Sequence, residues 1–500
     1  MWYLDLVAGV AAAHGERVAV VGSGRRIRFG ELHERTGRLG AALRRLGLRP
    51  GDRVALLAAN EPEYIEAQAA CLRSGFTLVP INTRLADPEV SFILADCTPA
   101  VLIGGRSQLT RSAALATECG VTHVFGLGEA DGVERYEDLL AAAVPDGTAD
   151  PTDPDLTALI LYTSGTTGRP KGAMIDRVAF TARVLVNCAE LQLRPTDVHL
   201  AALPMFHIAA FLAYAHIVVG GSVAMLPEFS PQQCLAAMSE EHVTTTVLVP
   251  TMIAMLLDSP EMASSPPPDL RQIVYGGASI TPRLLARAMD GFGCDMLQQY
   301  GMTESGASTI VRPADHDPND EEKLSSAGSE IVSFEVAVVD DDDIPVPPGE
   351  LGEVVCRAPS LMRGYWNRPD ATAEALRGGW MHTGDIGFRD SRGRLHITDR
   401  RNDMVITGGE NVYPREVEAA LLEHPAVGDV AVLGTADPTW GQVVTAVLVE
   451  PAPPDAELES WVRHRLAGYK VPRRWVRVGE LPRNATGKVL KHELRVMLAD

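Results

Sequence analysis

The stretch YTSGTTGRPKGA, from Tyr162 to Ala173, combines glycines and hydroxyl side chains with two cations, Arg169 and Lys171. The apolar run LTALIL before it is typical of a buried strand, and the residues from about Arg177 to Leu191 have helical spacing. A Gly/Ser/Thr loop after a strand presents backbone N–H groups and hydroxyls to a phosphate chain, and nearby cations balance its charge. The stretch therefore predicts a nucleotide-binding loop.

This loop does not have the order of a Walker phosphate loop. That motif is G-x-x-x-x-G-K-[ST], whereas here Lys171 is followed by Gly172 and supplies no hydroxyl for a metal ion. Four further motifs follow along the chain, and five ordered motifs are far more specific than one loop. They are LQQYGMTES (297–305), GWMHTGDIGFRD (379–390), ITDRRNDMVITGGENVYPREVE (397–418) and PRNATGKVLKHEL (482–494).

In these motifs and their order, the chain resembles the adenylate-forming enzymes, the superfamily of acyl-CoA synthetases, peptide-adenylation domains and luciferases. The resemblance covers essentially the whole chain. It implies that Thr303 contacts the α-phosphate, that Glu304 holds Mg²⁺, that Tyr300 stacks on adenine and that Asp385 accepts the ribose hydroxyls. It implies Lys488 as the mobile catalytic lysine. The other ATP/AMP-binding positions that it implies are Thr163, Ser164, Gly165, Thr166, Thr167, Lys171, Gly277, Ala278, Gln299, Gly301, Ile397 and Arg400.

Some of these residues also have plainer interpretations. A lone lysine near a terminus is usually a solvated charge, and a glutamate after a strand is often incidental. The acidic run from Asp340 to Asp343 lacks the spaced ligands and glycine of an EF-hand loop, so it predicts a solvated hairpin turn. The five motifs together favour the catalytic interpretation of Lys488 and Glu304.

The resemblance also implies a second step in which a thiol captures the activated acid. The C-terminal domain of the family rotates at a hinge, which by position is Asn402 here, and brings Gly408, Gly409 and Glu410 to the passage for CoA. Relatives mostly carry aspartate or lysine at the hinge. The short spacing between TGD and TDR favours CoA over a carrier protein as acceptor. Four cations of the C-terminal domain either contact the CoA nucleotide or are ordinary surface charges. They are Arg401, Lys470, Arg473 and Arg474.

The acyl pocket implied by the resemblance includes His207, Phe211, Gly276 and Gln299. Relatives that activate amino acids place an aspartate near PMFHIAAF, but this segment contains His207 and no acid, which favours a non-amino carboxylic acid. His207 is either a catalytic residue or a packed histidine. Gln299 stands where many relatives have glycine, so its larger side chain should shorten or polarise the pocket. The predicted pocket segments consist of small and apolar residues, so the pocket admits a fatty chain and an aryl ring equally well.

The sequence thus predicts an AMP-forming acid–thiol ligase that uses ATP, Mg²⁺ and CoA to convert a fatty or aryl acid into its CoA thioester. An alternative within the superfamily passes the activated oxyacid to a carrier protein or an amine. Hypotheses from other classes are a regulator that has lost catalysis and an ordinary ATPase. The presence of Lys488, Glu304 and Asp385 argues against the first, and the missing Walker order argues against the second.

The elements that position these residues alternate between apolar strand-like runs and helical stretches over the first 330 residues, which indicates helix-covered parallel sheets. Short strands with tight turns after Glu335 predict a small antiparallel element. A compact α+β unit of about 100 residues follows. The predicted fold class is therefore α/β, with an N-terminal domain over residues 1–400 and a mobile C-terminal domain over 401–500 joined by a hinge.

The amino-acid composition excludes several other classes of function and location. With 45 Lys and Arg against 65 Asp and Glu, the net charge is −20, which argues against a nucleic-acid or anionic-membrane binder. We expect no membrane-spanning segment, a cytoplasmic location, and a monomer or homodimer. The seven cysteines are scattered without a C-x-x-C pair, so they predict free thiols rather than disulfides or a metal site.

Overall fold

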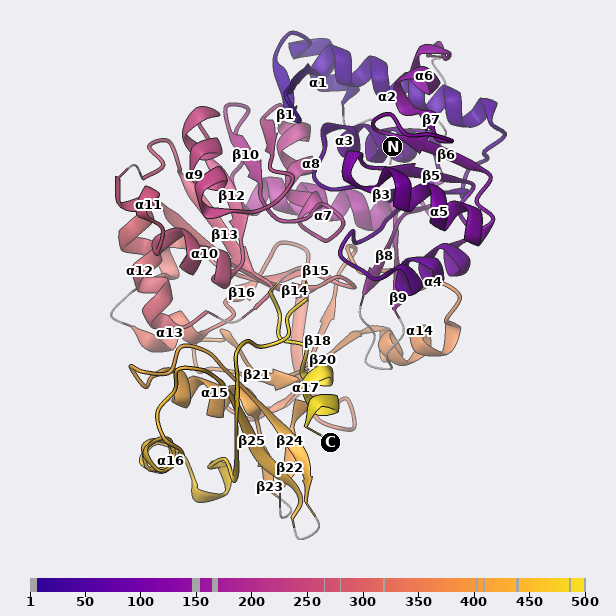
Figure 1. The fold of residues 1–500 in the computed structure, drawn as a ribbon. Coiled ribbons are helices and arrows are strands. Elements are labelled where there is room, and N and C mark those ends of the chain that lie inside the picture. The colour runs from indigo at the N-terminus through magenta and orange to yellow at the C-terminus, as the bar shows by residue number, and fades with distance from the viewer. Residues whose placement is uncertain are drawn as a thin grey trace.

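The computed structural model describes residues 7–145, 153–163, 170–264, 266–278, 280–317, 320–400, 403–407, 410–437, 440–484 and 487–498. Two large sheets with their helices, a small antiparallel sheet and a C-terminal unit make up the chain (Figure 1). The predicted α/β fold class is confirmed.

The first large sheet has nine strands and is parallel through its centre. Its central strands, such as Thr245–Leu248, are fully buried, as expected for strands covered on both faces. In spatial order the strands are β16 (Ser329–Glu330), β15 (Gly306–Val311), β14 (Asp295–Met302), β13 (Gln272–Gly276), β12 (Thr245–Leu248), β10 (Val198–Ala201), β11 (Ser222–Met225), β1 (Val18–Gly22) and β2 (Arg25–Arg28).

The second large sheet has eight strands, two of which hold the described ends of the phosphate-loop motif, residues 162–163 and 171–173. In spatial order the strands are β19 (Gly364–Tyr365), β9 (Lys171–Asp176), β8 (Thr157–Thr163), β4 (Thr77–Pro80), β3 (Arg53–Leu57), β5 (Val101–Gly104), β6 (His123–Gly126) and β7 (Glu134–Arg135). Strand β9 returns antiparallel to β8. Lys171 therefore begins a strand instead of leading directly into the next helix.

Helices cover both large sheets. The helices of the N-terminal region are α1 (Ala8–His14), α2 (Phe29–Arg45), α3 (Pro62–Ser74), α4 (Asp87–Cys97), α5 (Leu109–Cys119), α6 (Tyr136–Ala141), α7 (Arg177–Glu190), α8 (Ala210–Val219), α9 (Pro231–Glu240), α10 (Pro250–Leu257), α11 (Pro260–Ser264), α12 (Pro282–Phe292), α13 (Glu321–Ser325) and α14 (Pro369–Ala375). Helices α7 and α8 lie between the sheets (Figure 1), where the rings of Phe180 and Phe211 pack with centroids 5.2 Å apart. This pair of helices forms one wall of the site described below.

Asp176 and Arg177, which follow the phosphate-loop motif, form the start of α7. The Asp176 carboxylate caps the helix by accepting a hydrogen bond of 2.7 Å from the Ala179 backbone N–H. Arg177 is buried and donates to the Leu72 carbonyl at 2.9 Å. Both residues therefore stabilise the local fold.

The chain also contains a small antiparallel sheet, as the short strands and tight turns after Glu335 predict. Its strands are β17 (Glu335–Val339), β18 (Gly352–Arg357), β20 (Met381–Arg389) and β21 (Leu395–Arg400). The acidic run after β17 is an exposed turn in which the Asp340 backbone N–H donates to the Ile344 carbonyl at 2.9 Å. The prediction of a solvated hairpin turn is confirmed.

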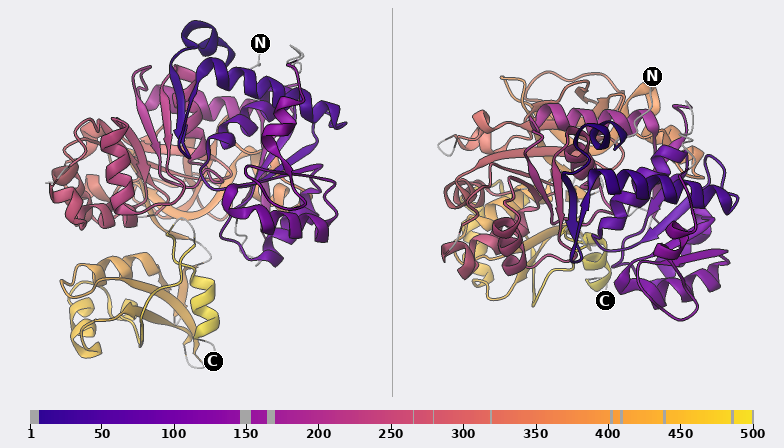
Figure 2. Two further views of the ribbon diagram at one scale, coloured as in Figure 1. Left: turned by 45° about the horizontal axis from the view of Figure 1, so that its top comes forward. Right: turned by 90° about the horizontal axis from the view of Figure 1, so that it is seen from above.

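The C-terminal unit has its own sheet and its own apolar core, including Val417, Val432 and Val444. Figure 2 shows it as a separate body at one side of the N-terminal region. Its strands are β22 (Val405–Thr407), β23 (Glu410–Val412), β24 (Val430–Asp437), β25 (Gly441–Val449) and β26 (Arg474–Val478), and its helices are α15 (Pro414–Leu422), α16 (Asp455–Arg463) and α17 (Lys491–Met497). The Arg415 backbone N–H donates to the Asp399 carboxylate at 2.8 Å and links α15 to β21.

All seven cysteines are free thiols, as predicted. Within the described ranges, no cluster of three or more His, Cys, Asp or Glu side chains is arranged to hold a metal ion. Among the helices that the structure describes, none combines the length and the apolar character needed to cross a bilayer.

A pair of buried histidines links α8 to the first sheet. The rings of His199 and His216 stack 4.5 Å apart, and Thr245 Oγ1 lies 3.2 Å from His199 Nδ1 and 2.8 Å from His216 Nε2. His216 Nδ1 donates to the Leu212 carbonyl at 2.7 Å. Burial lowers the pKa of His216 to about 4 and that of His199 well below its ordinary value. Both rings are therefore neutral in the folded protein at neutral pH.

This pair predicts a loss of stability in mild acid. The unfolded chain binds a proton at His216 below pH about 6.5, whereas the folded chain does so only near pH 4. The contribution of neutral His216 to the free energy of unfolding is therefore complete above pH about 6.5 and decreases as the pH falls below that value. Between pH 7 and pH 5, wild type should lose about 2 kcal/mol more unfolding free energy than His216→Gln. Urea unfolding at the two pH values measures the difference. Equal losses would contradict the assignment, and His242→Gln, at an exposed histidine, is the matched control.

Candidate active site

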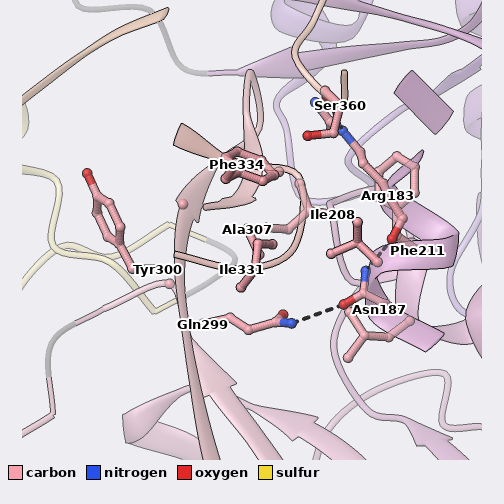
Figure 3. Close-up of a pocket in the computed structure, with 15 residues that line it drawn as sticks. Arg183, Asn187, Ile208, Phe211, Gln299, Tyr300, Ala307, Ile331, Phe334 and Ser360 are labelled. Atoms are coloured by element: carbon pink, nitrogen blue, oxygen red, sulfur yellow. Dashed lines mark hydrogen bonds between the residues drawn. The ribbon is translucent and has the colours of Figure 1, made fainter. Parts of the chain in front are cut away.

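Strand β14 divides the site into two sides because successive side chains of a strand point to opposite faces. In Figure 3, Tyr300 points to one side of the strand and Gln299 to the other. The Tyr300 hydroxyl donates to the Asp385 carboxylate at 2.7 Å. The Gln299 amide instead donates to Asn187 of α7 at 3.0 Å. The two neighbouring side chains therefore make their hydrogen bonds on opposite sides of the strand, although both residues line the pocket described below.

The Tyr300 side brings together residues of two predicted motifs. Asp385 on β20 is buried and pairs in register with Arg400 on β21, and Ile397 of β21 lies opposite Gly387. Burial raises the pKa of Tyr300 well above its usual value, so its hydroxyl is a neutral donor. An aromatic ring beside a carboxylate that accepts hydrogen bonds matches the chemistry of a purine nucleoside, whose ribose hydroxyls are donors.

The phosphate-loop motif meets the YGMTES motif at its strand ends. Thr163 and Lys171 are register partners in the β8–β9 hairpin, and the Thr163 hydroxyl lies 3.5 Å from the Glu304 carboxylate. Glu304 is only 5% exposed. Four predicted loop residues, Ser164, Gly165, Thr166 and Thr167, lie outside the described residues.

Tyr365 on β19 is a site residue that the sequence analysis missed. Its hydroxyl donates to the Glu304 carboxylate at 2.9 Å, and Lys171 Nζ lies 5.2 Å from the centre of its ring. Tyr365 thus touches both the acid and the cation at the end of the phosphate loop. The only sequence signal is an aromatic residue in RGYWNRP, a segment outside the motifs.

Arg183 of α7 is a second residue that the motifs did not identify. It donates to three backbone carbonyls, those of Ser360, Thr303 and Glu304, at 2.9, 3.0 and 3.0 Å. Burial lowers its pKa to about 9. Because the donors of one rigid guanidinium hold consecutive carbonyls, Arg183 fixes the backbone that presents Thr303 and Glu304.

The Gln299 side of β14 opens into a pocket between β14, β15 and α7–α8 (Figure 3). Its walls are mainly apolar, with Phe211 and Gln299 as predicted lining residues and Gly277 at one edge. Gly276 and His207 are not among the described lining residues. A Cβ at Gly276 would lie 2.4 Å from the Gln299 carbonyl oxygen, so this glycine permits the close approach of β13 and β14.

His207 packs edge-on against Phe206, with ring centroids 4.7 Å apart. Burial lowers its pKa to about 4, so the imidazole is neutral at neutral pH. Gly301 is fixed sterically, since a Cβ there would lie 1.9 Å from the Gly306 carbonyl oxygen. Ala278 follows Gly277 at the end of β13.

The Gly-Lys turn of the C-terminal unit reaches the N-terminal region. A Cβ at Gly487 would lie 2.9 Å from Thr251 Oγ1 at the start of α10, and Val249 beside it also faces Gly277. Lys488 is exposed, and its backbone N–H donates to the Asn484 side chain at 2.9 Å. The turn that carries the predicted catalytic lysine is therefore next to the edge of the pocket.

The described part of the predicted CoA passage begins at Glu410. Strand β23, which begins at Glu410, is at the end of the C-terminal unit away from the N-terminal region (Figure 1). Gly408, Gly409 and the predicted hinge residue Asn402 lie outside the described residues.

A nucleoside-type subsite and an apolar pocket on the two sides of one strand, with a lysine turn beside them, define an adenylate-forming enzyme. The family model for "AMP-binding enzyme" matches residues 7–366, and that for "AMP-binding enzyme C-terminal domain" matches residues 416–488. The chain belongs to the AMP-binding enzyme family.

Similar proteins agree with this assignment. The chain is 40% identical over 485 residues to a feruloyl-CoA synthase from an Amycolatopsis species, with 95% of each chain covered. It is 35% identical over 474 residues to a long-chain-fatty-acid–CoA ligase of Mycobacterium tuberculosis, covering 94% of this chain and 93% of the other. The amide bond synthetase McbA from Marinactinospora thermotolerans superposes with a TM-score of 0.91 at 33% identity, with 99% of each chain covered. The predicted class of AMP-forming acid–thiol ligase is confirmed.

Proposed function

We propose that this protein is an ATP-dependent carboxylic acid:CoA ligase. Its acid substrate has no amino group and carries an apolar chain or an aryl ring. The observation that carries the proposal is the meeting of Thr163, Lys171 and Glu304 at the end of β14, which separates the Tyr300–Asp385 subsite from the acyl pocket. This arrangement would place the carboxylate of an acid in the pocket against the α-phosphate of ATP.

In the first step, a carboxylate oxygen of the acid attacks the α-phosphorus, and pyrophosphate leaves. Two anions must meet, so fixed positive groups and donors should supply most of the rate enhancement. Lys171, Lys488 and the Thr303 hydroxyl would act on the phosphates, and Arg183 holds the Thr303 and Glu304 carbonyls in place. Tyr300, Asp385 and Arg400 would bind the nucleoside, beside Gly277, Ala278, Gly301 and Ile397.

Glu304 fits a magnesium ion. Hard divalent cations at phosphates prefer a carboxylate oxygen, and Mg²⁺ usually takes only one or two carboxylates in such sites. The buried Glu304 carboxylate is held by the Tyr365 hydroxyl near the phosphate loop. A bound ion would neutralise phosphate charge there.

In the second step, the CoA thiolate attacks the acyl carbonyl carbon, and AMP leaves. Here the Gly-Lys turn lies at the site and β23 lies away from it, so we propose that this conformation serves the first step. A rotation at Asn402 would bring β23 to the site in place of the Gly-Lys turn for the second step. On the C-terminal unit, the Arg473 guanidinium lies 4.3 Å from the ring of the exposed Trp440, a surface suited to the CoA nucleotide. Lys470 is instead engaged by Glu416 at 2.6 Å.

A second candidate acceptor is an amine or a carrier-protein thiol. The amide bond synthetase neighbour and a 35% identical relative named as a fatty acid–acyl-carrier-protein ligase, from Streptomyces coeruleorubidus, support this alternative. The first step is the same in both proposals, so only the fate of the adenylate separates them.

A panel of fatty, benzoic and cinnamic acids with ATP, Mg²⁺ and CoA tests the proposal. We expect acid-dependent pyrophosphate release and a CoA thioester detected by mass spectrometry. Adenylate that forms but is captured only by amines or by a carrier protein would favour the alternative. ADP as the sole nucleotide product would contradict both.

A further inference from the structure

The acyl pocket has a mainly apolar lining that also contains an amide pair, Gln299 and Asn187 (Figure 3). Three other polar residues of the lining, Arg183, Ser360 and Tyr300, donate hydrogen bonds to groups elsewhere. Gln299 Nε2 donates to Asn187 Oδ1 at 3.0 Å, and Asn187 Nδ2 donates to the Arg183 carbonyl, one turn earlier in α7, at 2.9 Å. Asn187 is only 7% exposed. The helix backbone thus fixes the Asn187 amide, which in turn fixes the orientation of the Gln299 amide.

This orientation determines what Gln299 offers to a ligand. Its Nε2 is directed to Asn187, so the carbonyl oxygen Oε1 is the atom left to face other partners in the pocket. A carbonyl oxygen accepts hydrogen bonds and cannot donate them. Gln299 is half-buried, and a ligand that covers its Oε1 with hydrocarbon alone is disfavoured, because the oxygen would lose its hydration without compensation.

The other walls suit a flat apolar group. Phe211 and Phe334 contribute rings, and Ile208 and Ile331 contribute aliphatic surface (Figure 3). Phe211 is itself held in place, since its ring packs against Phe180 with centroids 5.2 Å apart and against the Arg183 guanidinium at 5.2 Å. Rigid rings on the walls and one oriented acceptor together match an aromatic ring that carries a hydroxyl.

We propose that Gln299, oriented by Asn187, is the specificity-determining residue of the acyl pocket and selects an aromatic acid with a hydrogen-bond donor on its ring. This inference rests on the proposed ligase function and narrows its substrate from fatty or aryl acids to hydroxyaryl acids. A ring hydroxyl donates to Gln299 Oε1, whereas a methoxy group in its place has no proton to donate and is disfavoured.

The test compares cinnamic, 3-hydroxycinnamic, 4-hydroxycinnamic and 4-methoxycinnamic acids, with dodecanoic acid as the fatty probe, by pyrophosphate release from the full-length protein. At least one hydroxylated acid should exceed cinnamic acid in kcat/KM by about ten- to a hundredfold, the range for satisfying an acceptor that the bound ligand covers. The methoxy acid should not show this gain. In Gln299→Leu the ratio of hydroxylated to unsubstituted acid should fall to near one.

Two variants separate recognition from general damage, because the ratio within each variant cancels a common loss of activity. Gln299→Glu keeps an acceptor and should keep the preference. Val186→Ala, at an apolar lining residue, is the matched control and should change both acids together. Equal kcat/KM for hydroxylated and unsubstituted acids in wild type, a preserved ratio in Gln299→Leu, or dodecanoic acid as the best substrate would overturn the inference. Absence of pyrophosphate with every acid would instead overturn the ligase proposal itself.

Discussion

Lys488→Ala should lower the rate of adenylate formation by roughly two to three orders of magnitude, the usual cost of one preorganised charge in such a site. The Gly487 turn meets Thr251 at the start of α10, beside the Val249 that faces Gly277, so the lysine is carried to the edge of the pocket. Acid-dependent pyrophosphate release measures the effect. The fold should be unaffected, because Lys488 is exposed and its hydrogen bond to Asn484 comes from the backbone.

The same variant separates the two steps. If Lys488 acts only on the phosphates, Lys488→Ala should still convert a chemically prepared acyl-adenylate and CoA into thioester at close to the wild-type rate. Arg463→Ala removes an exposed cation of the same unit and should leave both steps unchanged. A wild-type rate of adenylate formation in Lys488→Ala would show that the lysine is not catalytic.

Glu304→Gln should also reduce adenylate formation, by about a hundredfold, and should weaken the dependence on Mg²⁺. Glutamine has nearly the same size and can still accept the hydrogen bond from Tyr365, so the substitution mainly removes charge. The measurement is a magnesium titration of the initial rate, in which the variant should need much more metal to reach its own maximum. A titration curve that coincides with wild type would contradict the metal role.

Tyr365→Phe should change the magnesium dependence in the same direction as Glu304→Gln but by a smaller amount. It keeps the ring beside Lys171 and removes only the hydroxyl that donates to Glu304. A hydrogen bond to a charged group is worth about 1.5–3 kcal/mol, so the magnesium half-saturation should shift in the same direction by about tenfold. Thermal unfolding of both variants checks that the buried Arg183 still holds the backbone of this loop.

Several strands of the two large sheets were predictable because their residues fall in mainly apolar runs bounded by turn residues. The runs at 53–59, 100–105, 243–251 and 272–278 contain β3, β5, β12 and β13. Helix α7 was predictable from its spacing and begins at the expected residue, Arg177. These features depend on local sequence, which is why one chain suffices to recognise them.

The site residues outside the motifs were not predictable in this way. Tyr365 reaches Glu304 only because β19 pairs with β9, a contact between segments nearly two hundred residues apart in the chain. Arg183 has the spacing of an ordinary helix residue, and only the packing of α7 under the YGMTES segment gives its three backbone partners. The separation of Gln299 from Tyr300 follows from the pleat of β14, but which face holds the nucleotide depends on tertiary structure.

Transfer of a heavy-oxygen label from the carboxylate of the acid tests the central claim most directly. Attack of that carboxylate on the α-phosphorus leaves one of its oxygens on AMP when the adenylate is consumed by CoA. Mass spectrometry of the nucleotide should therefore find one labelled oxygen in AMP and none in pyrophosphate. Label in inorganic phosphate accompanied by ADP, or unlabelled AMP formed at the same rate without acid, would contradict the account.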